Sequence, residues 1–137
     1  MKLSFDHVTL TVSDLERSIE FYRDTLGLKV LGKIEQPDAG LTIVYFEAGE
    51  GVLELFYFSD EEDSDLNERE DTDIGLQHIG FGVSNVDEVA DKLRRNDVEF
   101  TLEPMDAGGG VRIAFFKDPD GILLELVEGE LDLEQIE

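Results

Sequence analysis

Two short segments of this chain share one alternation of apolar and polar residues. In the stretch FDHVTLTV, residues 5–12, the apolar side chains fall on one side of a strand and His7 lies on the other side. In LQHIGFGV, residues 76–83, the same alternation puts His78 opposite the apolar positions. Because successive side chains of a strand point to opposite faces, both segments are predicted to be strands that bury one face and carry a histidine on the other.

Each of these strands is followed by the predicted start of a helix. Ser13 with Glu16, and Ser84 with Asp87, have the spacing of a capping box. Apolar residues then recur at helical spacing, and Gly27 is expected to end the first helix. Three further strands are predicted in each half, at residues 28–35, 41–47 and 51–58 and at residues 98–103, 111–117 and 122–127.

The chain therefore reads as two tandem β-α-β-β-β modules, an α+β fold in which the modules form a curved mixed sheet. We predict one domain, residues 1–137, because a chain of this length buries one sizeable core. Its predicted parts are a first module, an acidic linker, a second module and an acidic tail, at about residues 3–58, 59–75, 76–128 and 129–137. A calcium loop in the linker is disfavoured, because its carboxylates lack the spacing and the internal glycine of an EF-hand.

One offset relates the histidines and two glutamates of the halves. The histidines lie 71 positions apart, and the same offset connects Glu54 in VLELF with Glu125 in ILLEL. A lone strand histidine is more often a surface or core residue than a ligand, but the shared offset favours a common role. A carboxylate in an apolar strand is costly unless it is paired or bound to a cation. We therefore predict a metal cleft to which both sheets contribute, with the ligands His7, Glu54, His78 and Glu125.

Composition narrows the partners and the chemistry. The 34 acidic and 11 basic residues give a net charge of −23, which disfavours nucleic acid and anionic membranes as partners. Since 41% of residues are hydrophobic and fall in periodic runs, a packed fold with an acidic shell is expected, similar to proteins from salt-adapted cytoplasms. The chain has no cysteine, so a metal would be held by nitrogen and oxygen. No signal peptide or membrane span is readable, which predicts a cytoplasmic protein.

Three stretches resemble one family over about residues 3–129. FDHVTLTVSDLERSIEFYRDTLGLKV, QHIGFGV and FKDPDGILLELVE are similar to signatures of the vicinal oxygen chelate superfamily, which includes glyoxalases, bleomycin-resistance proteins and extradiol dioxygenases. The ligand order His, Glu, His, Glu resembles that of the glyoxalase I (lactoylglutathione lyase) group. Fosfomycin-resistance enzymes and extradiol dioxygenases use His, His, Glu instead.

The resemblance implies a metal-dependent lyase that isomerises the hemithioacetal of a 2-oxoaldehyde and a thiol to a thioester, through a metal-stabilised enediolate. By the same resemblance His7 and His78 hold the metal, Glu125 acts as the catalytic base, and Glu54 is its near-symmetric counterpart. The implied cofactor is one divalent ion per site, nickel, cobalt, manganese or zinc. The resemblance also implies a small-molecule substrate and a homodimer whose sites are shared between chains.

Other activities of the superfamily remain open alternatives. These are a methylmalonyl-CoA epimerase-like isomerase, an iron-dependent extradiol dioxygenase and a non-catalytic binding protein resembling bleomycin-resistance proteins. Glu54 argues against the open oxygen site of a dioxygenase, and the four ligands together argue against a metal-free module. In glutathione-using relatives an arginine and an asparagine lie where this chain has Thr11 and Phe58, so a different thiol is possible. Arg112 is expected to be a solvated strand residue rather than an anchor for a substrate carboxylate.

Overall fold

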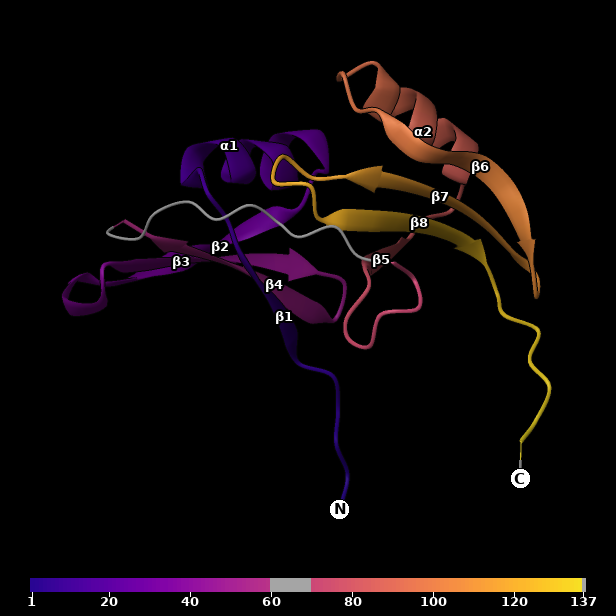
Figure 1. Ribbon diagram of the computed structural model, residues 1–137, viewed down its shortest axis with the longest axis horizontal. Helices are drawn as coiled ribbons and strands as arrows, with labels where there is room; N and C mark the ends of the chain where they lie inside the picture. Colours follow the sequence, from indigo (N-terminus) through magenta and orange to yellow (C-terminus); the bar gives the residue numbers. More distant parts are fainter. Residues whose placement is uncertain (60–69, 137) are drawn as a thin grey trace. The chain divides into compact units, whose positions relative to one another are not determined.

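The structure is a computed structural model that describes residues 1–59 and 70–136 (Figure 1). By its contacts the chain divides into two compact units, Met1–Asp65 and Leu66–Glu137. Each unit contains a four-stranded mixed sheet and one α-helix, so the predicted α+β class and the two β-α-β-β-β modules are confirmed. Residues 60–69 of the predicted linker lie outside the described residues.

The first unit holds its four strands in the order β1-β4-β3-β2. β1 runs parallel to β4, and the other neighbouring strands are antiparallel. The α-helix continues into a π-helical turn that Gly27, with φ +78°, terminates. The elements are β1 (His7–Thr11), α1 (Leu15–Glu20), η1 (Phe21–Thr25), β2 (Lys29–Gln36), the 3-10 turn η2 (Pro37–Ala39), β3 (Leu41–Ala48) and β4 (Gly51–Phe58).

The second unit repeats this arrangement with the strand order β5-β8-β7-β6. β5 runs parallel to β8, and the remaining pairs are antiparallel. β6 is longer than predicted, because irregularities in its pairing with β7 let it follow that strand to the tip of the hairpin. The elements are β5 (Ile79–Gly82), α2 (Val86–Arg94), β6 (Phe100–Gly108), β7 (Val111–Lys117) and β8 (Leu123–Gly129).

Each sheet packs one face against the helix of its own unit, as Figure 1 shows for α1 and α2. In the first unit the rings of Tyr22 and Phe46 lie 6.1 Å apart, and both side chains are fully buried. The second unit buries Val86 and Ala90 of α2 and Phe116 and Leu124 of its sheet. Each large apolar side chain contributes about 1.5–3 kcal/mol on burial. Packing against the helix therefore holds each sheet in place, and with it the residues on the sheet face that points away from the helix.

Both helices begin one residue later than the sequence predicted. Asp14, not Ser13, caps α1 by accepting a hydrogen bond from the Arg17 amide at 3.1 Å. Asn85, not Ser84, caps α2 by accepting one from the Glu88 amide at 3.0 Å. Ser13 and Asp14 are adjacent candidates for the cap of α1, and Ser84 and Asn85 for that of α2. In each case the second residue has the extended backbone that a cap requires. The predicted capping boxes were therefore wrong by one position.

The turn DPDG at residues 118–121 connects β7 to β8, as predicted. A carboxylate oxygen of Asp118 accepts hydrogen bonds from the amides of Asp120 at 2.9 Å and Ile122 at 2.8 Å. Gly121 has a φ of +90°, which a side chain would strain. This local bonding fixes the start of β8 and so the position of Glu125 within it.

Beyond β8 the residues 130–136 are all exposed and form no regular element. In the part of the chain that the structure describes, no helix has the length and apolar character needed to cross a membrane.

Candidate metal centre

In the first unit, parallel pairing of β1 with β4 brings His7 to Glu54. Thr9 lies directly opposite Glu54 in the register, and His7 is two residues earlier on the same face. The Nε2 atom of His7 is 3.0 Å from Oε2 of Glu54. Glu54 is only 9% exposed, between two fully buried leucines of β4. Two of the four predicted ligands thus meet within the first unit.

A neighbouring carboxylate sets the orientation of the His7 ring. Nδ1 of His7 lies 2.7 Å from Oδ2 of Asp6, the distance of a strong hydrogen bond. This hydrogen bond raises the pKa of His7 above its usual value, and the negative charges of Glu54 and Asp6 act in the same direction. With the Nδ1 proton donated to Asp6, the neutral ring presents an unprotonated Nε2 toward Glu54.

The pair of His7 and Glu54 therefore fits a bound cation. In that tautomer Nε2 and the carboxylate oxygen are both acceptors, and they face each other at hydrogen-bond distance. Two acceptors at this separation require either a proton or a positive ion between them. Imidazole nitrogen and carboxylate oxygen are donors that divalent nickel, cobalt, manganese and zinc accept.

The second unit forms the corresponding pair less tightly. His78 immediately precedes β5, and its Nε2 atom is 3.4 Å from Oε1 of Glu125. The ring of Phe115, which lies opposite Glu125 in the register, meets the His78 ring edge to face with centroids 5.0 Å apart. The side chain of Glu125 is 16% exposed. Here an aromatic ring contacts the histidine, whereas in the first unit a carboxylate bonds it.

Each predicted ligand thus lies beside the partner from its own half. Within neither unit, over residues 1–59 and 70–136, do three histidine, aspartate or glutamate side chains gather as a metal-binding group. The structure brings together His7 with Glu54 and His78 with Glu125. That both pairs bind one ion stays a prediction.

The two pairs lie on largely apolar faces. Around Glu54 the same face of the first sheet carries Tyr45 and Phe56, which lie opposite or next to it in the register. Thr11 is exposed at the end of β1, and Phe58 is half-buried at the end of β4 with its ring 6.1 Å from that of Phe56. Neither Thr11 nor Phe58 offers a charge to a substrate carboxylate. The face favours apolar contact around a pair whose glutamate is buried and whose histidine is partly exposed.

Arg112 lies at the surface and is paired with two carboxylates rather than free to bind a substrate. Its Nε and Nη2 atoms donate to the two carboxylate oxygens of Asp87 at 2.8 and 3.0 Å, and Nη1 donates to Asp106 at 3.2 Å. The same contacts raise the pKa of Arg112 and lower that of Asp87. The guanidinium is 30% exposed and pairs with two exposed carboxylates, so Arg112 is a surface strand residue, as expected, that joins the start of α2 to β6 and β7.

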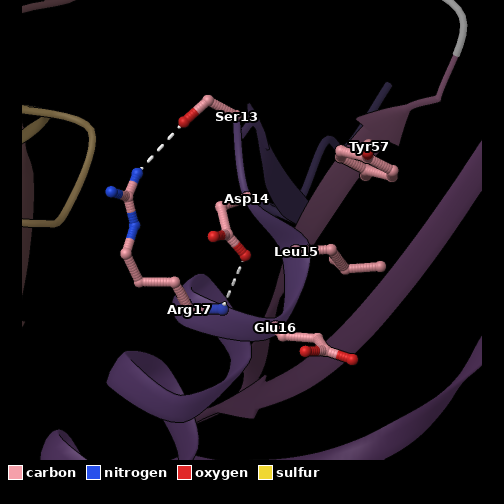
Figure 2. Close-up of a pocket in the computed structure, with 6 residues that line it drawn as sticks. All are labelled: Ser13, Asp14, Leu15, Glu16, Arg17 and Tyr57. Atoms are coloured by element: carbon pink, nitrogen blue, oxygen red, sulfur yellow. Dashed lines mark hydrogen bonds between the residues drawn. The ribbon is translucent and has the colours of Figure 1, made fainter.

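An open hollow lies at the start of α1, between the helix and β4 (Figure 2). Arg17 curls over it and donates to the Ser13 hydroxyl at 3.0 Å, while Asp14 caps the helix. Tyr57 borders the hollow from the face of β4 that packs against α1. Glu54 points to the other face, so this hollow is separate from the candidate metal centre.

Sequence reasoning missed two neighbours of the predicted ligands. Asp6 bonds His7, and its signal was the acid in FDH where the second half has glutamine in LQH. Gly80 lies directly opposite Glu125. Its signal was the pair of glycines in HIGFG at positions where the first strand has Thr9 and Thr11.

Comparison with known proteins finds one family model and close relatives that match most of this chain. Residues 4–126 match the family described as Glyoxalase/Bleomycin resistance protein/Dioxygenase superfamily. The chain is 35% identical over 129 residues to the lactoylglutathione lyase of Salmonella typhimurium, covering 90% of this chain and 91% of that protein.

Two solved structures share the fold over most of this chain. The crystal structure of SMU.1112c matches with a TM-score of 0.79 and 32% identity, covering 92% of this chain and 98% of that one. The trypanothione-dependent glyoxalase I of Leishmania major matches with a TM-score of 0.74 and 34% identity, covering 93% and 87%. The predicted fold class is confirmed by these structures as well as by the strand topology.

Proposed function

Since this chain belongs to the Glyoxalase/Bleomycin resistance protein/Dioxygenase superfamily, we propose that it is a metal-dependent enzyme of the glyoxalase I type. Relatives named lactoylglutathione lyase support the assignment to lyases. The proposed reaction converts the hemithioacetal of a 2-oxoaldehyde and a thiol into the thioester of a 2-hydroxy acid. The observation that carries the proposal is the pairing of each histidine with the glutamate of its own half.

His7, Glu54, His78 and Glu125 are the proposed ligands of one divalent ion. When bound, the ion supplies positive charge that offsets the negative charge developing on two neighbouring substrate oxygens. The histidines take no part in proton transfer. Asp6 keeps the Nδ1 proton of His7 on the side away from the ligand set.

Glu125 is the proposed general base. Its carboxylate takes the proton from the carbon that bears the sulfur and returns it to the neighbouring carbon, which was the ketone carbon of the 2-oxoaldehyde. The hydroxyl proton on the sulfur-bearing carbon passes to the former ketone oxygen, so that the sulfur-bearing carbon becomes the thioester carbonyl, the neighbouring carbon carries the new hydroxyl, and the overall change is an isomerisation. A positioned base contributes about 10²–10⁴-fold to such a step. The apolar faces around the pairs, with Tyr45, Phe56 and Phe115, would limit water near the transferred proton.

Metal analysis followed by assay would test the proposal. The purified protein is stripped, reloaded with nickel, cobalt, manganese or zinc, and assayed with methylglyoxal and either glutathione or γ-glutamylcysteine, with methylmalonyl-CoA in parallel. We expect metal-dependent thioester formation with at least one thiol. Epimerisation of methylmalonyl-CoA without thioester formation would move the assignment to the epimerase branch. Turnover that is unaffected by metal removal would contradict the proposed metal dependence.

We also propose that the chain forms a cytoplasmic homodimer in which each site takes its first half from one protomer and its second half from the other. Two inactive variants test this arrangement, His7→Ala with Glu54→Gln and His78→Ala with Glu125→Gln. Mixed dimers regain one intact site if the halves belong to different chains. They stay inactive if both halves belong to one chain, and a monomer by sedimentation would also contradict the proposal.

A further inference from the structure

The two glutamates of the candidate metal centre differ in what lies opposite them. On the first sheet Thr9 is the register partner of Glu54, and on the second sheet Gly80 is the register partner of Glu125. The offset of 71 that relates the ligands also relates Thr9 to Gly80. Residues directly opposite each other on neighbouring strands share one face of the sheet. A side chain therefore lies opposite Glu54, whereas the residue opposite Glu125 has none.

The space between Gly80 and the side chain of Glu125 is narrow. A Cβ atom added to Gly80 would lie 3.3 Å from Oε1 of Glu125 and 3.8 Å from a methyl carbon of Val127. The same Oε1 atom is the one that faces His78, at 3.4 Å. A methyl group at position 80 would therefore either displace the carboxylate oxygen by a few tenths of an ångström or restrict the movement of that oxygen.

The backbone does not explain the glycine. Neither Gly80 nor Gly82 has a positive φ, so the strand conformation admits a side chain at both positions. Gly82, two residues further along the same face, has nothing within 4 Å of an added Cβ. Glycine in a strand interior is otherwise unfavourable, because it weakens the strand. What distinguishes Gly80 is that a side chain at this position would press against the carboxylate of Glu125.

We propose that Gly80 is a positioning residue that gives Glu125 room to move, and that this freedom is what makes Glu125, rather than Glu54, the base. The inference rests on the proposed function and deepens it. A carboxylate that takes a proton from one carbon and returns it to the next must shift between two positions. Small displacements of a reacting group are costly, since a misplacement of about 1 Å can lower a rate by about a hundredfold.

The test compares two alanine variants of one strand. Gly80→Ala and Gly82→Ala both remove the entropic disadvantage of glycine, but only the first adds a methyl group beside Glu125. We expect Gly80→Ala to lower kcat by about tenfold or more with KM and metal content unchanged. Gly82→Ala should keep both constants within about twofold. Equal kcat values for the two variants would overturn the inference.

A second measurement is independent of turnover. In metal-free protein the urea midpoint of Gly80→Ala should lie about 0.5 M below that of Gly82→Ala. In a Glu125→Ala background the crowded carboxylate is absent, so this difference should vanish. A difference that persists in that background would show that the methyl group meets something else, and would contradict the inference.

The outcomes separate this inference from the proposed function. If wild-type protein turns over no hemithioacetal, the proposed function fails, and the urea cycle still decides whether Gly80 provides the space for Glu125. If wild type is active and the two alanine variants are equally active, the function stands and the inference fails. Should Gly80→Ala not fold, the inference requires that Gly80→Ala with Glu125→Ala folds like Glu125→Ala alone, and failure of this double variant would overturn it.

Discussion

The two units build the same pair of side chains with different support. In the first, Asp6 binds the far side of the His7 ring, Thr9 lies opposite the glutamate, and the pair is 3.0 Å apart. In the second, an aromatic edge contacts His78, a glycine lies opposite Glu125, and the pair is 3.4 Å apart. The repeat preserves the candidate ligands but not their neighbours. This difference favours a first half that holds its ligands firmly and a second half that lets its carboxylate move.

Neutralising the two glutamates is the sharpest way to break the comparison. Glutamine keeps the shape of the side chain and removes its basicity, so Glu125→Gln is expected to lower kcat by about a thousandfold. Glu54→Gln removes one proposed ligand and no base, with an expected loss of about tenfold. Steady-state rates normalised to metal content measure both variants. Equal losses would show that the two carboxylates share the proton transfer.

Removing the carboxylate behind His7 should weaken metal binding. Asp6→Asn keeps the side-chain shape and loses the charge that holds the Nδ1 proton, and changes of this kind typically cost about 10–100-fold in metal affinity. The matched control is Gln77→Ala, since Gln77 precedes His78 but donates to the Asp73 carbonyl at 2.6 Å. Calorimetric titration of metal-free protein with nickel gives both affinities. If both variants bind nickel like wild type, the assigned role of Asp6 is wrong.

The repeat and the register explain why so much of this arrangement could be predicted. A period-two pattern fixes which strand residues share a face, and a common offset fixes which positions correspond, so one histidine and one glutamate of each half could be placed on the same face of its sheet. The cap residues were predicted one position early, because Ser13 and Asp14 are both good caps and only the backbone conformation decides between them.

The supporting residues could not be predicted in the same way. The effect of Gly80 depends on a distance of 3.3 Å across two strands, which the sequence pattern does not contain. The pairing of Arg112 with Asp87 joins a strand to a helix 25 residues away and depends on tertiary packing. The periodicity of the sequence thus identifies faces and partners, while the freedom of a side chain to move follows only from atomic neighbours.

The acidic shell is a property that both units share, and it predicts a dependence of stability on salt. With a net charge of −23, self-repulsion should destabilise the fold when it is unscreened. We expect the thermal midpoint to rise by on the order of 5 °C between about 0.1 M and about 2 M KCl. Replacing the exposed Glu16, Glu20 and Glu88 by glutamine should reduce that rise. A midpoint independent of salt would remove the hypothesis of salt adaptation.

The smallest expected effect concerns an ion pair of the second unit. Arg112 pairs with Asp87, whereas the corresponding position of the first unit in the strand register is the uncharged Thr42. Arg112→Gln should lower the midpoint slightly at neutral pH. Because the arginine depresses the pKa of Asp87, its stabilisation is fully present above the ordinary value of 3.8 and is lost as the pH falls through the depressed value.

The midpoints of wild type and Arg112→Gln should therefore converge in acid, which thermal melts between about pH 3 and pH 7 would follow. Arg95→Gln is the matched control, because it removes the same charge from the same unit while the Arg95 guanidinium donates only to a backbone carbonyl among its described contacts. If Arg95→Gln shows the same pH-dependent difference in thermal midpoint from wild type, the loss of stability reflects the change in net charge. A gap confined to Arg112→Gln would show that this ion pair secures α2, the helix that follows the strand carrying Gly80.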